Sequence, residues 1–209
     1  MTGRARGVLI AIEGIDGAGK STLQRVLAGR WRQRGLPLKL TAEPSKGPYG
    51  RRARRAASGN PWIAALAFTE DRRRARPEVE AALASGRIVL QDRSFYSTLA
   101  YQGSMLSPAL RRELVSLQRG AARTPDRVLW LDLPLSNARS RMALRGRRLE
   151  ATETMAALRS AAAAYRRLAR SPRWVRLDAR RTPAELAAAA DRALGPWLAR
   201  RGPPTRSGA

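Results

Sequence analysis

The chain contains no cysteine and no histidine among its 209 residues. Without cysteine it has no disulfides, thiolate zinc sites, CxxC redox pairs or cysteine nucleophiles. Without histidine it lacks the commonest general base and metal ligand, which excludes histidine-dependent triads and HExxH zinc chemistry. Phosphoryl transfer is still compatible with this composition, because it depends mainly on positioning and on cations.

Acidic residues are also scarce, with 16 Asp+Glu against 41 Lys+Arg and a formal net charge of +25. Such an excess is typical of proteins that bind nucleic acids or other polyanions. However, only Lys20, Lys39 and Lys46 are lysines, and the arginines are spread over helical patterns instead of forming a basic tail. We therefore interpret most of the charge as solvated helix faces, and nucleic acid is not expected as a partner.

Long apolar runs are absent as well. No run is long enough to cross a bilayer, and residues 1–7 lack the apolar centre of a signal peptide. We expect a cytoplasmic protein that does not contact a membrane. The length predicts one domain of α/β size over residues 1–200, followed by a disordered tail over residues 201–209.

Apolar runs of strand length alternate with helical patterns along the chain. Strands are expected at residues 8–12, 38–41, 88–91, 128–133 and 174–177. Helices are expected at residues 21–34, 51–57, 61–84, 97–103, 108–122, 136–145, 152–170 and 183–199, with residues 47–50 as a turn. Pro77 is expected to kink or divide the longest helix. This alternation predicts an α/β fold, a three-layer αβα sandwich around a five-stranded parallel sheet.

A glycine-rich motif follows the first expected strand. Residues 14–21 satisfy the Walker A pattern GxxxxGK[ST] of P-loop proteins, in which backbone N–H groups and a helix N-terminus surround phosphate oxygens. Lys20 is expected to bridge the β- and γ-phosphates of ATP, and Ser21 to bind Mg²⁺. The residues expected to bind ATP here are Gly14, Ile15, Asp16, Gly17, Ala18, Gly19, Lys20, Ser21 and Thr22.

A second acidic residue is expected near the metal. Asp92 follows the apolar run at residues 88–91, so it lies at the carboxyl end of a buried strand, where ligands bind in open α/β sheets. The sequence therefore predicts that Asp92 holds Mg²⁺, directly or through water, beside Ser21.

Several separated motifs then resemble the thymidylate kinase family of P-loop nucleoside monophosphate kinases. In chain order they are residues 12–22, Glu43-Pro44, Phe68-x-x-Asp71-Arg72, Asp92-Arg93 and Ser97-x-x-Ala100-Tyr101-Gln102-Gly103. The order and spacing match from about residue 8 to residue 198. The resemblance implies ATP- and Mg²⁺-dependent phosphorylation of dTMP to dTDP by in-line transfer, and it implies a homodimer.

The resemblance also implies roles in an acceptor site. Asp16 would meet the 3′-hydroxyl of dTMP, Arg93 and Arg54 would bind its phosphate, and Phe68 would stack on thymine while Arg72 reaches O4. The bulk of the Tyr101 ring would disfavour a 2′-hydroxyl, and Ser97, Thr98 and Gln102 would lie near the base. The full implied set is Asp16, Glu43, Pro44, Arg54, Phe68, Arg72, Arg93, Ser97, Thr98, Tyr101 and Gln102.

Gly17 stands where some members of the family carry a catalytic arginine in the P-loop. The resemblance therefore points to a short arginine-rich lid at about residues 145–152, with Arg145, Arg147 or Arg148 closing over ATP and Arg141 packing against adenine. The residues expected to be catalytic are Lys20, Asp16, Arg93, Arg145, Arg147 and Arg148.

Two features of the sequence keep other functions open. Ser94 follows Asp92-Arg93 where the family usually has Tyr or His, which leaves a kinase for dUMP or a broader set of nucleoside monophosphates as the first alternative. The second alternative is a P-loop nucleic-acid-binding regulatory protein that uses the +25 charge. That protein would bind DNA or RNA with a steep salt dependence.

Overall fold

The computed structural model describes residues 7–144 and 154–200. Within them, five strands form one sheet in the order β2-β3-β1-β4-β5, and every neighbouring pair is parallel. The strands are β1 (Val8–Glu13), β2 (Leu38–Ala42), β3 (Ile88–Asp92), β4 (Arg127–Asp132) and β5 (Trp174–Asp178). The predicted five-stranded parallel sheet of an α/β protein is confirmed.

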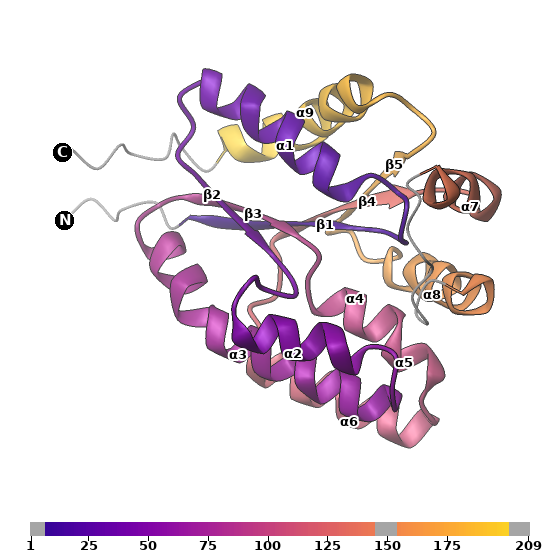
Figure 1. Cartoon of the computed structure of the whole chain (residues 1–209). Helices are drawn as coiled ribbons and strands as arrows, with labels where there is room; N and C mark the ends of the chain where they lie inside the picture. The colour runs from indigo at the N-terminus through magenta and orange to yellow at the C-terminus, as the bar shows by residue number, and fades with distance from the viewer. Residues whose placement is uncertain (1–6, 145–153, 201–209) are drawn as a thin grey trace.

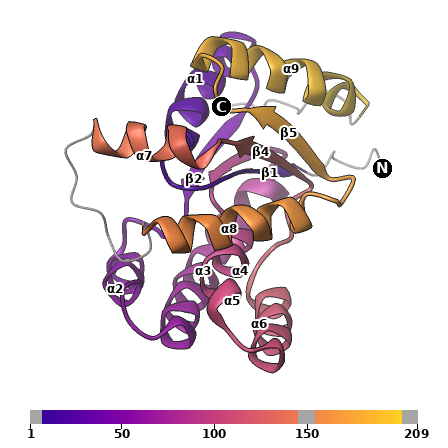
Figure 2. The same ribbon diagram turned by 90° about the vertical axis from the view of Figure 1, so that its right-hand side faces the viewer.

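Helices cover both faces of the sheet (Figure 1). Helices α1 and α9 lie on one face, and α2 to α6 together with α8 lie on the other, so the molecule has the three layers that the sequence predicts. Helix α7 lies beyond the carboxyl ends of the strands, as Figure 2 also shows. The helices are α1 (Lys20–Gln33), α2 (Pro48–Ala56), α3 (Pro61–Ala84), α4 (Phe95–Ala100), α5 (Gln102–Met105), α6 (Pro108–Ala121), α7 (Leu135–Ala143), α8 (Met155–Leu168) and α9 (Pro183–Ala199).

The central strands are mostly apolar, because helices cover them on both faces, and their polar residues lie at the carboxyl ends. All six residues of β1 and all five of β3 are buried. The largest apolar cluster surrounds the sheet and includes residues of α1, α8 and α9, among them the fully buried Trp31. The indole Nε1 of Trp31 donates to Asp191 Oδ1 of α9 at 2.5 Å, which joins α1 to α9.

The strand order places β1 at the topological switch point of the sheet: the chain adds β2 and β3 on one side of β1, and β4 and β5 on the other. Ligands of open parallel sheets bind beyond the carboxyl ends of the strands at such a point. The register pairs Asp92 of β3 with Ile12 of β1 and with Ala42 of β2. The three segments that follow these strands therefore leave the sheet at the same edge.

Three expected boundaries were wrong. Helix α2 begins at Pro48 and not after a turn at residues 47–50, because proline suits the first helical position, where its missing N–H is not needed. Helix α3 is not divided at Pro77 but continues through it, where the backbone carbonyl that loses its N–H partner belongs to the exposed Arg73; the kink expected there stays a prediction. The helix expected over residues 97–103 starts earlier, after Ser94, and is divided by Tyr101 into α4 and α5.

Among the described helices, none has the length and apolar character that a membrane span requires. The lid predicted at residues 145–152 and the tail predicted at residues 201–209 both fall outside the described residues.

Candidate active site

The loop between β1 and α1 has a backbone that requires glycine at two positions. Gly14 has φ 143°, and a Cβ atom there would lie 2.6 Å from the carbonyl oxygen of Leu131. Gly17 has φ 81°, and its Cβ would lie 3.1 Å from the carbonyl oxygen of Ala138. Left-handed backbone and close approach to neighbouring chains both exclude larger residues. The loop is therefore wound tightly against β4 and α7 at the start of α1.

Lys20 is buried at the first turn of α1, where its Nζ donates to the carbonyl oxygen of Ile15 at 2.9 Å. Burial and the nearby Arg93 lower the pKa of Lys20 to about 8, although Asp16, Asp92 and Glu13 act in the opposite direction. A buried ammonium group inside a glycine loop is a strong attractor for anions. Its low pKa follows mainly from burial, which these three carboxylates only partly offset.

Ser21 and Asp92 meet beside this lysine. The Ser21 hydroxyl donates to Asp92 Oδ2 at 2.5 Å, and the other carboxylate oxygen, Oδ1, is buried and has no hydrogen-bond partner. A hydroxyl and a carboxylate with an unsatisfied oxygen are suitable ligands for Mg²⁺, which takes one or two protein oxygens together with water and phosphate. The residues present therefore fit the predicted metal.

A pocket opens next to the glycine loop, with about 670 Å³ of space between its walls, including the solvent at its mouth. All eleven residues that the resemblance implies as substrate-binding line it, although they come from six separate segments of the chain. The complete lining is Asp16, Glu43, Pro44, Arg54, Ala57, Phe68, Arg72, Arg93, Ser94, Ser97, Thr98, Tyr101 and Gln102.

Asp16, Arg93 and Tyr101 form the end of the pocket nearest to the glycine loop. The Arg93 guanidinium pairs with Asp16 Oδ1 and lies over the Tyr101 ring, 5.5 Å from its centroid. The Tyr101 hydroxyl donates to Asp16 Oδ2 at 2.7 Å. Burial works against the charge of Arg93, but Asp16 and its neighbours more than offset it and hold the pKa of Arg93 well above the usual range. Arg93 is thus a permanent, half-buried cation.

A second ion pair forms the opposite wall. Arg72 of α3 donates through Nε to Glu43 Oε2 at 2.8 Å, pairs with Gln118 of α6, and donates to Thr98 Oγ1 at 3.2 Å. Glu43 also accepts from Gln91 of β3 at 2.8 Å. Arg72 is only 5% exposed, so its orientation is set by these partners. Phe68 lies one turn earlier on the same helix.

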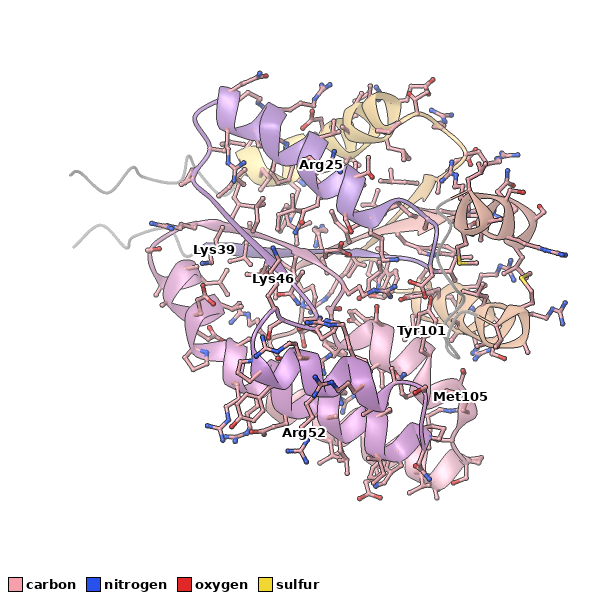
Figure 3. All side chains as sticks on the ribbon, viewed as in Figure 1. Arg25, Lys39, Lys46, Arg52, Tyr101 and Met105 are labelled. Carbon is pink, nitrogen blue, oxygen red and sulfur yellow. The ribbon has the colours of Figure 1, made fainter. Side chains whose placement is uncertain are left out.

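Helix α2 offers four arginines, and one of them lines the pocket. Arg54 donates to the carbonyl oxygens of Pro44 at 3.2 Å and Ser45 at 2.9 Å, which holds it beside the turn after β2. Arg52 of the same helix does not line the pocket. In Figure 3 it projects from the outer side of α2, away from Tyr101, which lines the pocket. The α2 arginine of the predicted acceptor site is therefore the one whose side chain reaches the pocket.

Sequence reasoning missed Glu13 and Tyr165. Glu13 is fully buried at the end of β1 and accepts from the Ser94 hydroxyl, the Ser97 hydroxyl and the Tyr165 hydroxyl of α8. Burial raises the pKa of Glu13, although these hydrogen bonds act against the increase. A charged residue directly before a glycine loop is the signal that could have identified Glu13, whereas the expected strand stops one residue earlier, at residue 12.

The remaining predicted residues lie elsewhere or are not described. Arg141 of α7 donates to the carbonyl oxygen of Ala179, 2.9 Å away in the segment after β5, and it does not line the pocket. Arg145, Arg147 and Arg148 fall outside the described residues. Their roles, and that of Arg141, stay predictions.

A buried strand, a glycine loop with Lys20 and Ser21, and an acid on the neighbouring strand define the P-loop NTPase class. Known proteins narrow this class, because the family model described as thymidylate kinase matches residues 12–189. The chain belongs to the thymidylate kinase family.

Three relatives show how far this similarity extends. A thymidylate kinase of Akkermansia muciniphila is 35% identical over 198 residues, which cover 92% of this chain and 94% of the relative. One of Xanthomonas campestris pv. campestris (strain B100) is 40% identical over 144 residues, 67% of this chain. One of Desulfotalea psychrophila is 35% identical over 141 residues, 65% of this chain and 68% of the relative. The chain matches 62% of the length of the Xanthomonas relative.

Proposed function

We propose that this protein transfers the γ-phosphoryl group of ATP to dTMP and releases dTDP and ADP. The observation that carries the proposal is one pocket lined by all eleven residues of the predicted acceptor site, among them Asp16 of the glycine loop. Asp16 belongs to both, because it lies within the glycine loop and pairs with Arg93 in the pocket. An acceptor bound there has its phosphate next to the phosphates that Lys20 attracts.

The walls of the pocket suit a deoxynucleoside monophosphate. Phe68 offers an aromatic face, and the buried Arg72 offers a donor to a base carbonyl. The Tyr101 ring is buried and is tied to Asp16 by its hydroxyl, which limits space near the sugar. We therefore assign the base to the Phe68 end and the phosphate to the Arg93 end.

The reaction needs no general base from the protein. The second pKa of a phosphate monoester is about 6, so the acceptor oxygen is already ionised at neutral pH. The protein must instead bring two anions together, and Lys20 and Arg93 supply fixed positive charge on either side of the transferring group. The absence of histidine is consistent with this mechanism.

We assign Mg²⁺ to Ser21 and Asp92, whose buried Oδ1 has no partner within the protein. When bound, the ion neutralises charge on the β- and γ-phosphate oxygens. Asp92 is held by β3 between β1 and β2, and the Ser21 hydroxyl lies at the start of α1. These residues would orient the ATP phosphates toward the acceptor pocket.

The Asp92 assignment gives a direct prediction. Asp92→Asn keeps the size of the side chain and removes its charge, so the Mg²⁺ concentration that gives half the maximal rate is expected to rise about 10- to 100-fold. It is measured by titrating MgCl₂ at saturating ATP and dTMP. Asp178→Asn on β5 is the control, because Asp178 pairs with the exposed Arg180 outside the pocket. An unchanged Mg²⁺ requirement in Asp92→Asn would contradict the assignment.

A nucleotide panel tests the proposed substrate. ADP release with dTMP, dUMP, dCMP and UMP is expected to give the highest kcat/KM for dTMP and the lowest for UMP. The comparison of dTMP with dUMP isolates the 5-methyl group, which is worth about 10- to 200-fold in a fitted apolar pocket. Equal kcat/KM for dTMP and UMP would refute the gate at Tyr101. Equal values for dTMP and dUMP would favour the broader kinase.

Ser94, which stands where the family usually has Tyr or His, has a structural role in this protein. The Ser94 hydroxyl accepts from the backbone N–H of Tyr96 at 3.3 Å and donates to Glu13 at 2.7 Å. It therefore caps α4 and supports a buried carboxylate. The nucleic-acid-binding alternative is not favoured by family membership. The homodimer, the lid arginines and the cytoplasmic location stay predictions.

A further inference from the structure

A buried carboxylate joins three elements behind the acceptor pocket. Glu13 Oε1 accepts from the backbone N–H and the hydroxyl of Ser94, each at 2.7 Å. Its Oε2 accepts from the Ser97 hydroxyl at 2.7 Å and from the Tyr165 hydroxyl at 2.8 Å. The Ser97 and Tyr165 hydroxyl oxygens are themselves 2.9 Å apart. β1, the start of α4 and α8 therefore share one network, and neither Glu13 nor Tyr165 lines the pocket.

This network ends at Arg93. Arg93 Nη1 donates to Ser97 Oγ at 3.1 Å, the same oxygen that Glu13 and Tyr165 contact. The backbone of Arg93 has φ 67°, the only positive value among the described non-glycine residues. L-residues disfavour this conformation, and it persists only where the surroundings hold it. The tight contacts of Ser94 and Ser97 with Glu13 fix the chain directly after Arg93.

We propose that Tyr165 of α8 is a positioning residue for Arg93, acting through Glu13 and Ser97. This inference rests on the proposed function, in which Arg93 binds the acceptor phosphate. The Tyr165 hydroxyl donates to the carboxylate and keeps Ser97 Oγ turned so that one lone pair faces Arg93 Nη1. Helix α8 thereby influences the acceptor site without touching the substrate.

Removal of this hydroxyl has a specific structural consequence. Glu13 Oε2 would keep only Ser97 as a donor, while its burial stays the same. A buried carboxylate that loses a donor is poorly compensated and draws its remaining partners closer. Ser97 would then move relative to Arg93. Because the guanidinium also pairs with Asp16, a change in its position alters the phosphate end of the pocket.

The test is a double-mutant cycle with Tyr165→Phe and Arg93→Ala. Tyr165→Phe alone is expected to lower kcat/KM for dTMP about tenfold while the KM for ATP changes less than about twofold. In the Arg93→Ala background, Tyr165→Phe is expected to have almost no further effect, because its target is gone. If the two effects multiply, Tyr165 does not act through Arg93 and the proposal is overturned.

Tyr96→Phe is the matched control. Tyr96 is a neighbouring tyrosine on α4 whose ring contacts Phe95 and Trp174, with centroids 4.2 Å and 5.0 Å away. It also loses one hydroxyl, but no contact with Ser97 is involved, so kcat/KM for dTMP should stay within about twofold of the natural value. A tenfold loss in this variant would assign the effect to general packing.

A second measurement separates failure of this inference from failure of the proposed function. The side-chain ¹⁵Nε resonance of Arg93, assigned from its loss in Arg93→Lys, is recorded in the full chain without nucleotide. We expect it to shift in Tyr165→Phe and to stay in place in Tyr96→Phe. An unshifted resonance in Tyr165→Phe overturns the positioning role. If the natural chain phosphorylates no nucleoside monophosphate, but the Arg93 resonance still shifts in Tyr165→Phe, only the proposed function is overturned.

Discussion

Lys20→Met is expected to give a protein that resists unfolding better than the natural chain and has lost phosphoryl transfer. Lys20 is 7% exposed, has one hydrogen-bond acceptor in Ile15, and has a pKa of about 8 against 10.5 for an ordinary lysine. The difference corresponds to a cost of about 3 kcal/mol for the charged form in the folded protein. Methionine fills similar space without that charge.

The expected increase in the free energy of unfolding at pH 7 is about 1–3 kcal/mol, measured by urea denaturation of the nucleotide-free protein. The expected loss in kcat is at least about 10²–10³-fold, because a preorganised cation at the transferring group is removed. Lys39→Met is the control, since Lys39 forms a surface pair with Glu78 and carries no comparable burial cost. Lower stability of Lys20→Met at pH 7 would contradict the argument.

The pH dependence has a definite sign. Between pH 8 and pH 10.5, Lys20 is protonated in the unfolded chain and increasingly neutral in the folded one, so the unfolded state binds more protons and this group makes stability rise with pH. The stability difference between Lys20→Met and the natural chain should therefore be largest below pH 8. It should shrink steadily toward pH 10.5.

Arg93→Ala is expected to lower kcat/KM for dTMP by at least about 10³-fold, the scale of an arginine that contacts a transferring phosphoryl group. Arg93 joins Asp16, Ser97 and the face of Tyr101, so its loss removes the cation that pairs with Asp16 at the phosphate end of the pocket. The KM for ATP should change less, because Lys20 and Ser21 are retained. Initial rates with each substrate varied in turn measure both effects.

Two further variants separate the side chain from the backbone of Arg93. Arg93→Gly should be as inactive as Arg93→Ala but about 1 kcal/mol more stable, because glycine adopts φ 67° without strain. Arg176→Ala is the control for loss of one arginine, since Arg176 is exposed on β5 and pairs with Asp132. An unchanged KM and kcat for dTMP in Arg93→Ala would exclude the residue from the acceptor site.

Local signals in the chain predicted much of the fold. The five expected strands all formed, with boundaries within one residue of those expected, and the central β1 and β3 did so because burial on both faces favours continuous apolar residues. The effect of proline on the helices was harder to predict from the sequence. Pro48 starts a helix and Pro77 lies within one, because the effect of a proline depends on whether its missing N–H and the opposing carbonyl lie in solvent.

The candidate site was predicted unevenly. The glycine loop could be identified from residues 14–21 alone, since only glycine tolerates the φ values of Gly14 and Gly17. The acceptor residues emerged from motifs at separate places in the chain, and the pocket gathers them. Glu13 and Tyr165, 152 positions apart and hydrogen-bonded at 2.8 Å, had no pattern to connect them.

The amino-acid sequence by itself determined the class of fold, the phosphate-binding loop and the types of side chain available for chemistry, because these follow from local spacing and backbone preference. Only the tertiary structure decided which arginine of α2 reaches the pocket, that Asp92 keeps one carboxylate oxygen without a partner, and that Glu13 supports Arg93 through Ser97. These depend on strand register and on how helices pack across the sheet. Hydrogen bonds between residues far apart in the chain form only after that packing is complete.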